Sequence, residues 1–218
     1  MEQRNKKSLY ITIGFFVAFI IYTILTMLVD VRPIGPEGSS VGFAAINGPV
    51  HDALPYSETF DKITDIIMYS SFLTVFVWGV VGVIQLVQKK SLKEVDSRLY
   101  VLLLFYVITV IIYVLFDKVP INYRPVILDE GLEPSYPSTH NLMTLAFFGF
   151  TIVNLKIMDI KKKSAKILII GLGVLCVLMP VLRLLAGVHW LTDIIGGIIL
   201  SIALVMAYNT AVNTKAKN

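Results

Sequence analysis

An arginine, a histidine and an aspartate lie close together in the last quarter of the chain, between two long apolar runs. They are Arg183, His189 and Asp193. If a helix begins near His189, this histidine and Asp193 are four residues apart and share one face of the helix. The carboxylate can then accept the Nδ1–H of the imidazole, which leaves Nε2 free as a nucleophile or base, while the arginine can hold an anion.

Two earlier stretches supply further basic and hydroxyl groups. One contains Lys118 and Arg124, and the other is Pro137-Ser138-Thr139-His140. Ser138 follows a proline and precedes an apolar run, which is typical of a helix N-cap. Free N–H groups at helix starts, together with three fixed cations, predict a site for a multiply charged oxyanion such as phosphate.

Two histidines and one carboxylate suit a two-step displacement at phosphorus. One histidine attacks phosphorus, and the other protonates the leaving oxygen and then activates water to break the phosphoenzyme. The side-chain cations neutralise the developing charge, so we expect no metal ion and no cofactor. The alternative of a metal site lacks a third neutral ligand at a usual spacing, and the adjacent arginines would repel a cation.

The apolar composition indicates an integral membrane protein. The 218 residues are 56% hydrophobic and gathered in long runs, whereas soluble domains are usually about 45–50% apolar. Such runs are long enough to cross about 30 Å of hydrocarbon, and the first is too long for a signal peptide. We predict an all-α fold: one domain over residues 1–218, a bundle of six transmembrane helices. The predicted spans are residues 9–29, 63–87, 99–116, 138–155, 167–185 and 189–208.

The basic residues are distributed unevenly between the two ends of the predicted bundle. Segments at one end, which include both termini, hold 14 of the 19 lysines and arginines. We expect a multi-pass protein of the cell membrane, and the positive-inside rule places that end, with both termini, in the cytoplasm. The predicted active site then lies at the extracytoplasmic face. Because membrane topology explains the basic loops, we do not expect nucleic acid as a partner.

Residues 30–62 separate the first two predicted spans. The segment is rich in proline and glycine, which break helices and make turns, but it also contains apolar residues from Val41 to Ile46. Two interpretations are open, a lid on the membrane surface and a plain connecting loop. His51 lies in this segment without motif neighbours, so we expect a structural role for it.

The three stretches resemble the signature of the type 2 phosphatidic acid phosphatase superfamily, membrane lipid-phosphate phosphatases related to the vanadium haloperoxidases. That signature is a lysine, six residues and Arg-Pro; then Pro-Ser-Gly-His; then Ser-Arg, five residues, His, three residues and Asp. Here the parts read Lys118, five residues and Arg124-Pro125; Pro137-Ser138-Thr139-His140; and Leu182-Arg183, five residues, His189, three residues and Asp193. The order, the gaps and the six-span frame extend the resemblance over nearly the whole chain.

The resemblance implies a role for each matching residue. His189 would be the nucleophile that becomes phosphohistidine, Asp193 would orient it, and His140 would be the general acid. The groups that would bind the substrate phosphate are Lys118, Arg124, Arg183, Ser138 and Thr139 with its backbone.

Three positions depart from the family's pattern. Asp117 occupies the position of the family's lysine, Thr139 replaces a glycine, and Leu182 replaces a serine. The side chain at position 139 makes the backbone less able to wrap around a phosphate, and the leucine removes a hydroxyl donor. The two histidines, their carboxylate and two arginines are retained, so we expect an active but divergent member.

The resemblance implies hydrolysis of the terminal phosphate of a lipid mono- or diphosphate in the membrane. The implied substrate classes are undecaprenyl diphosphate, phosphatidylglycerophosphate, and phosphatidic acid or diacylglycerol diphosphate, and the extracytoplasmic site slightly favours the first. The alternatives are a non-catalytic lipid-phosphate binder or flippase-like transporter on the same fold, and a lipid phosphotransferase. The pair of His189 and Asp193 together with His140 favours catalysis, because binding alone does not require it.

Overall fold

The computed structural model describes residues 2–128, 131–158 and 163–215. Within these ranges the chain is helical, with isolated β-bridges in place of strands, which confirms the all-α prediction. The topological count of basic residues includes Lys161, Lys162 and Lys217, which lie outside the described residues. The helices are α1 (Glu2–Leu28), η1 (Pro36–Gly38), α2 (Ala44–Ala53), α3 (Glu58–Lys89), η2 (Leu92–Glu94), α4 (Ser97–Lys118), α5 (Thr139–Ile157), α6 (Lys163–Leu185) and α7 (Leu191–Lys215).

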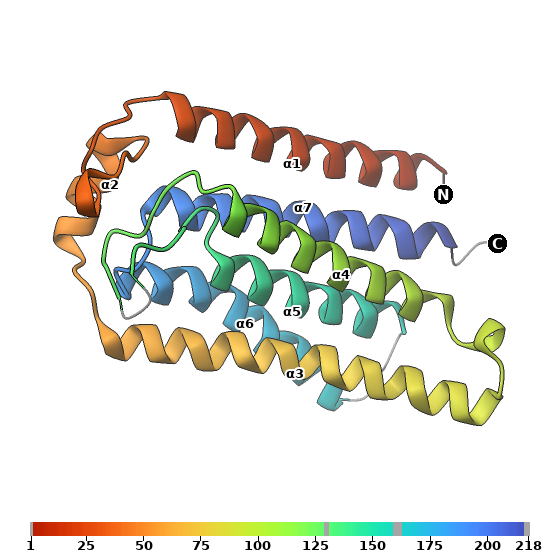
Figure 1. Ribbon diagram of the computed structural model, residues 1–218. Helices are drawn as coiled ribbons and strands as arrows, with labels where there is room; N and C mark the ends of the chain where they lie inside the picture. The colour runs from red at the N-terminus through yellow and green to blue at the C-terminus, as the bar shows by residue number, and fades with distance from the viewer. Residues whose placement is uncertain (1, 129–130, 159–162, 216–218) are drawn as a thin grey trace.

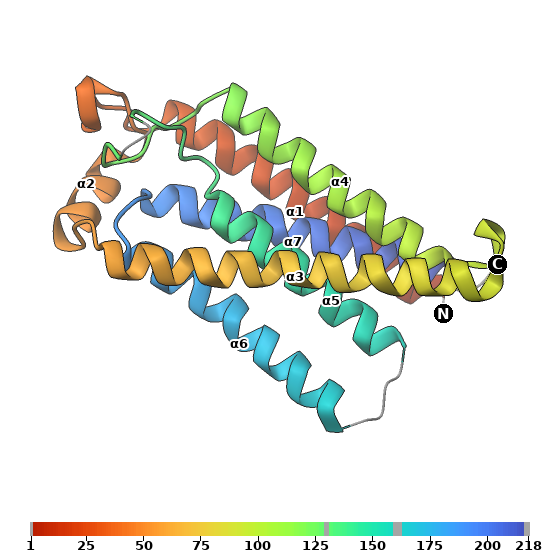
Figure 2. The same ribbon diagram turned by 60° about the horizontal axis from the view of Figure 1, so that its bottom comes forward.

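The long helices run side by side between two ends of the molecule (Figure 1). Both termini and the α3–α4 connection lie at one end. The opposite end carries α2, the connection from α4 to α5, and the turn from α6 to α7. Figure 2 shows that α6 diverges from α3 at one end and approaches it at the end that carries these loops.

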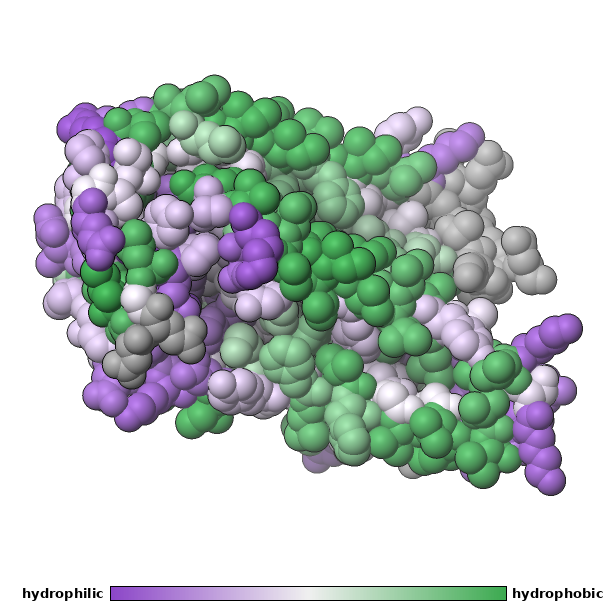
Figure 3. All heavy atoms as spheres, in the orientation of Figure 1, coloured by the Kyte–Doolittle hydropathy of each residue, from purple (hydrophilic) through white to green (hydrophobic). Residues whose placement is uncertain are grey.

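Five helices of the described chain are long and apolar enough to cross a membrane. They are Lys6–Leu28, Glu58–Lys89, Ser97–Lys118, Lys163–Leu185 and Leu191–Asn213, and they match five of the six predicted spans. The face drawn in Figure 3 accordingly shows a hydrophobic region between two more hydrophilic ends. The span predicted at residues 138–155 is formed by α5, which is not among the five, so the sixth crossing stays a prediction.

The helix α5 packs against α3, α4, α6 and α7 and is buried along most of its length. Two polar side chains of α5 accept hydrogen bonds from neighbouring helices. The Trp78 indole of α3 donates to Thr151 Oγ1 at 3.2 Å, and the Tyr208 hydroxyl of α7 donates to Asn154 Oδ1 at 2.6 Å. Helix–helix hydrogen bonds of this kind tie membrane bundles together. The polar side chains of α5 are therefore accommodated inside the bundle.

The segment between α1 and α3 is more than a plain connection, because it folds into α2 and packs on the start of α7. Asn47 in α2 is buried, and its Nδ2 donates to Thr192 Oγ1 at 2.9 Å. Val41 is buried as well, whereas Ile46 is exposed. The idea that this segment acts as a lid stays a prediction.

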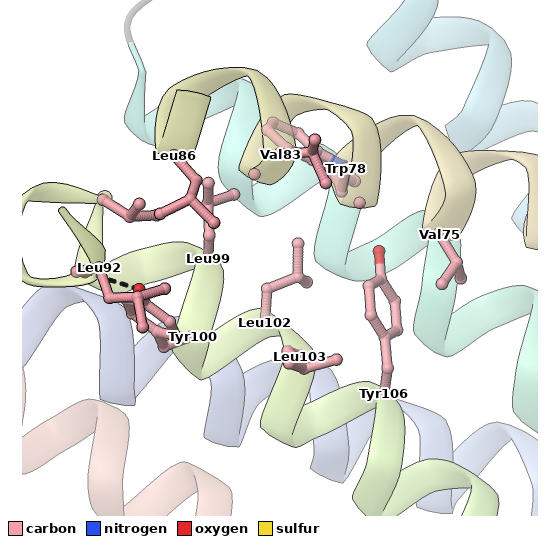
Figure 4. Close-up of a pocket in the computed structure, with 13 residues that line it drawn as sticks. Val75, Trp78, Val83, Leu86, Leu92, Leu99, Tyr100, Leu102, Leu103 and Tyr106 are labelled. Carbon is pink, nitrogen blue, oxygen red and sulfur yellow. Dashed lines mark hydrogen bonds between the residues drawn. The ribbon is translucent and has the colours of Figure 1, made fainter. Parts of the chain in front are cut away.

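An apolar cavity of about 300 Å³ lies between the C-terminal half of α3 and the N-terminal half of α4. Figure 4 shows Trp78, Val83 and Leu86 from α3 and Leu102 and Tyr106 from α4 around it. None of the residues predicted for the functional site lines this cavity.

A glycine fixes the path of the chain between α6 and α7. Gly187 has φ +67°, and a Cβ at this position would lie 2.7 Å from the backbone oxygen of Leu54 and 2.7 Å from the backbone carbon of Pro55. The adjacent Ala186 oxygen accepts the N–H of Ser57 at 3.0 Å. The turn that carries His189 is therefore pressed against the chain that enters α3.

We expect Gly187→Ala to destabilise the protein by about 2 kcal/mol or more, because alanine is strained at this φ and its Cβ overlaps backbone atoms. Gly173→Ala in α6 is the matched control, since nothing lies within 4 Å of a Cβ built there. Thermal unfolding in detergent measures both variants. Equal melting temperatures for the two variants would contradict the assigned role of Gly187.

Candidate active site

The start of α5 and the start of α7 are joined at the loop-bearing end of the bundle. The Ser138 N–H donates to the Asp193 carbonyl at 3.0 Å, and a Cβ at Gly197 would lie 2.9 Å from the Ser138 carbonyl oxygen. Ser138 occupies the predicted N-cap position of α5, although its side chain does not cap the helix. Its hydroxyl is buried and makes no hydrogen bond in the described part of the chain, so it is available to a ligand.

His189 and Asp193 lie close together, but not in the way that the spacing predicts. The helix α7 begins at Leu191, so His189 precedes it, and the distance from its Nδ1 to Asp193 Oδ2 is 3.7 Å, beyond hydrogen-bond range. The carboxylate accepts instead from Asn122 Nδ2 at 2.9 Å and from the Trp190 N–H at 3.0 Å. Asp193 thus caps the first turn of its own helix while facing the imidazole.

His189 is held as a neutral imidazole. The side chain is buried, and burial followed by the positive charges of Arg183 and Arg124 lowers its pKa well below the usual value. Neither ring nitrogen makes a hydrogen bond of normal geometry with any described residue. A neutral imidazole without a bonded partner is the form that can attack an electrophile.

The two arginines reach the site from different elements. Arg183, in the last turn of α6, is fully buried, pairs with Asp61 and donates to Thr64 Oγ1 at 3.0 Å. Arg124 lies in the α4–α5 connection with its Nε 3.1 Å from Glu133 Oε2, and its side chain is largely buried. Both guanidinium charges lie near enough to His189 to disfavour its protonated form.

The second histidine, His140, has a carboxylate partner of its own. It lies in the first turn of α5, and its Nε2 is 2.7 Å from Asp65 Oδ1 on α3. The charge that it carries when protonated also disfavours the protonated form of His189, so the two imidazoles are near one another. Thr139, the first residue of α5, is half-buried and lines a small polar hollow with Asp117 and Ser135.

The structure does not bring Lys118 to the other predicted site residues. Its side chain is 76% exposed, and its Nζ pairs with Asp117 at 2.9 Å. The physical reason is the spacing: Lys118 follows, rather than occupies, the position of the family's lysine, and at the end of α4 the next residue points about 100° around the helix.

Three residues of α3 and one loop residue contribute contacts that the motifs do not contain: Asp61, Thr64, Asp65 and Asn122. One signal could have found the two aspartates. They are four residues apart at the start of a long apolar run, where ionisable groups are costly unless they are paired or functional. His51, by contrast, packs edge-on against Trp190 at a ring distance of 5.4 Å.

Two comparisons with known proteins bear on the family and the fold of the chain. The family model of the PAP2 superfamily matches residues 116–217, which include every predicted site residue. The fold is similar to that of a crystal structure described as the first transmembrane PAP2-type phosphatidylglycerolphosphate phosphatase from Bacillus subtilis. The TM-score is 0.62 at 16% sequence identity, covering 95% of this chain and 97% of that chain. A search of curated proteins found no significant match.

We expect His189 to stay neutral at pH 6.5 in the wild type and its pKa to rise in Arg124→Gln. Removal of a nearby positive charge makes the imidazolium less unfavourable, so the pKa moves up toward that of a free histidine. Nuclear magnetic resonance of ¹⁵N-labelled histidine in micelles measures the titration. Lys118→Gln is the control and should leave the pKa of His189 unchanged, because the Lys118 ammonium is exposed and pairs with Asp117. A wild-type His189 that titrates near 6.5 would contradict the assignment.

Proposed function

Because the chain belongs to the PAP2 superfamily, we propose that it is a membrane lipid phosphatase that hydrolyses the terminal phosphate of a lipid mono- or diphosphate. One observation carries the proposal. Separate elements bring two arginines and two histidines to one end of an apolar helix bundle, which supports the proposal, and these side chains are Arg124, His140, Arg183 and His189. Such a set can bind a phosphate and displace its ester oxygen.

In this mechanism His189 Nε2 attacks phosphorus, and the bond from phosphorus to the lipid oxygen breaks. The leaving oxygen takes a proton from His140, and the lipid alcohol departs. Water then attacks the phosphohistidine, His140 accepts a proton from that water, and the phosphorus–nitrogen bond breaks to release inorganic phosphate. Asp193 stabilises the positive charge that develops on the His189 ring.

We assign phosphate binding to Arg124 and Arg183, together with the Ser138 hydroxyl and the N–H groups that the first turn of a helix leaves without an intrahelical partner. These groups support the proposal because they lie on the side of the bundle where His189 lies. Lys118 would have to leave Asp117 and turn inward to take part. The site therefore works with two fixed cations rather than the three that the motif suggests.

We infer that α5 is a sixth membrane crossing, that both termini are cytoplasmic and that the site is extracytoplasmic. The positions of the termini at one end and of the site at the other support this topology (Figure 1), as does the excess of basic residues at the end that carries the termini. The substrate would then enter from the outer leaflet, and this location slightly favours undecaprenyl diphosphate as the substrate class. Phosphatidylglycerophosphate and phosphatidic acid are the other classes.

A non-catalytic lipid-phosphate binder or flippase-like transporter is the second candidate function. It is favoured by the carboxylate partners of Arg183 and His140 and by the outward position of Lys118. A lipid phosphotransferase would use the same phosphohistidine with another acceptor. Hydrolysis remains the first candidate because the neutral, buried His189 suits nucleophilic attack.

Phosphate release by the purified protein in detergent tests the proposal. The panel contains undecaprenyl diphosphate, phosphatidylglycerophosphate, phosphatidic acid and diacylglycerol diphosphate. We expect His189→Ala to lower release by more than about a thousandfold while the protein stays folded, because the nucleophile is lost. His51→Ala is the matched histidine control and should retain activity. Lipid-phosphate binding without release by the wild type would favour the binder or transporter.

We also expect phosphate release to persist in EDTA, because side-chain cations rather than a metal ion neutralise the phosphate in the proposed mechanism. The measurement compares the initial rate before and after chelation and again after addition of magnesium or manganese. A rate that is lost in EDTA and restored only by the metal would overturn this part of the proposal.

A further inference from the structure

Two carboxylates of α3 face the site from outside the stretch that matches the family. Asp61 and Asp65 are four residues apart and therefore share one face of the helix. Asp61 pairs with Arg183, and Asp65 lies 2.7 Å from His140 Nε2. The family match begins at residue 116, so a helix that precedes it completes the surroundings of both the general acid and a phosphate-binding arginine.

The contact with Asp65 determines which nitrogen of His140 can exchange a proton. An ionised carboxylate only accepts hydrogen bonds, so the Nε2 that faces Asp65 carries the hydrogen. The other ring nitrogen, Nδ1, is buried and has no hydrogen-bond partner in the described residues. Nδ1 is therefore the nitrogen that can give a proton to a leaving oxygen and take one back from water.

The charges around His140 give Asp65 a second effect. Arg183 and Arg124 repel the protonated imidazole, whereas Asp65 attracts it. A general acid must begin the reaction protonated. Asp65 is the carboxylate that contacts this ring, so it favours the protonated form against the burial of the ring and the two guanidinium groups.

We propose that Asp65 is the positioning residue of the general acid, an inference that rests on the proposed phosphatase function. Asp65 holds the Nε2–H of His140 throughout the cycle and leaves Nδ1 to do the proton transfer. The site then contains two carboxylate–histidine pairs, Asp193 with the nucleophile His189 and Asp65 with the acid His140.

The proton balance follows from this arrangement. In the first step His140 carries hydrogens on both nitrogens, the phosphorus–oxygen bond breaks, and the Nδ1 hydrogen moves to the lipid oxygen. In the second step water adds its oxygen to phosphorus and gives a hydrogen to Nδ1, while the phosphorus–nitrogen bond to His189 breaks. His140 is protonated again, and Asp65 keeps its hydrogen bond to Nε2 in both steps.

The test compares two leaving groups in Asp65→Asn. A lipid alcohol is a poor leaving group that needs protonation, whereas 4-nitrophenolate leaves without it. We expect kcat/KM for a lipid monophosphate to fall by at least about tenfold and that for 4-nitrophenyl phosphate to change little. Asp65→Glu should recover part of the loss, because it restores a carboxylate.

Two variants of the same helix serve as comparisons. Asp61→Asn alters the partner of Arg183 rather than that of His140, so we expect it to change KM for both substrates together. Glu58→Gln alters an exposed side chain at the start of α3 and should leave both rates unchanged. Equal losses on both substrates in Asp65→Asn would overturn the positioning role and indicate a general structural one.

A second measurement separates this proposal from the proposed function. The ¹⁵N chemical shifts of His140, recorded at a pH where its ring is neutral, report its tautomer in the resting protein, whether or not the protein turns over a substrate. We expect the Nε2–H form in the wild type and a mixture of tautomers in Asp65→Asn. An Nδ1–H form in the wild type overturns the proposal. Absence of phosphate release with the expected tautomer overturns the enzymatic function instead.

Discussion

The buried guanidinium of Arg183 is the constraint on which the rest of the site depends. A charge that is removed from water must be paired, and breaking such a pair costs about 3–5 kcal/mol. The partners, Asp61 and Thr64, both come from α3, so the end of α6 is tied to the start of α3. The turn that follows α6 carries His189, and the position of the imidazole therefore depends on an ion pair between two other helices.

Asp193 connects helix formation to the chemistry of the site in a similar way. Its carboxylate accepts from the Trp190 backbone and from Asn122, so it stabilises the first turn of α7 and anchors the α4–α5 connection at once. The same carboxylate lies 3.7 Å from His189. These two hydrogen bonds hold the carboxylate in place, so the imidazole has a carboxyl neighbour without a direct hydrogen bond.

The apolar runs predict where the long helices lie, but the predicted spans miss the start of α1 and the end of α7 by seven residues. The motif spacings bring Arg124, His140, Arg183, His189 and Asp193 to one end. The contacts that complete the site could not be predicted, because they join residues far apart in the chain. Asp61 precedes Arg183 by 122 residues, and Asp65 precedes His140 by 75. The local periodicity of the sequence gives no information about contacts between residues so far apart. The motif does not show which way Lys118 points, since one residue of spacing turns a side chain around the helix, and in the structure it is exposed and pairs with Asp117.

The carboxylate partners also determine what kind of ligand the site can accept. A ligand that binds Arg183 must take the place of Asp61 or share the guanidinium with it. A single carboxylate gains little from this exchange, because Asp61 is tethered nearby at a high effective concentration. A phosphate has a charge of about −1.5 to −2 and three strong acceptor oxygens, and it can contact Arg124, Arg183 and the start of α5 together. Under the proposed function, the internal ion pair would therefore favour lipid phosphates over the fatty-acid carboxylates that share the membrane.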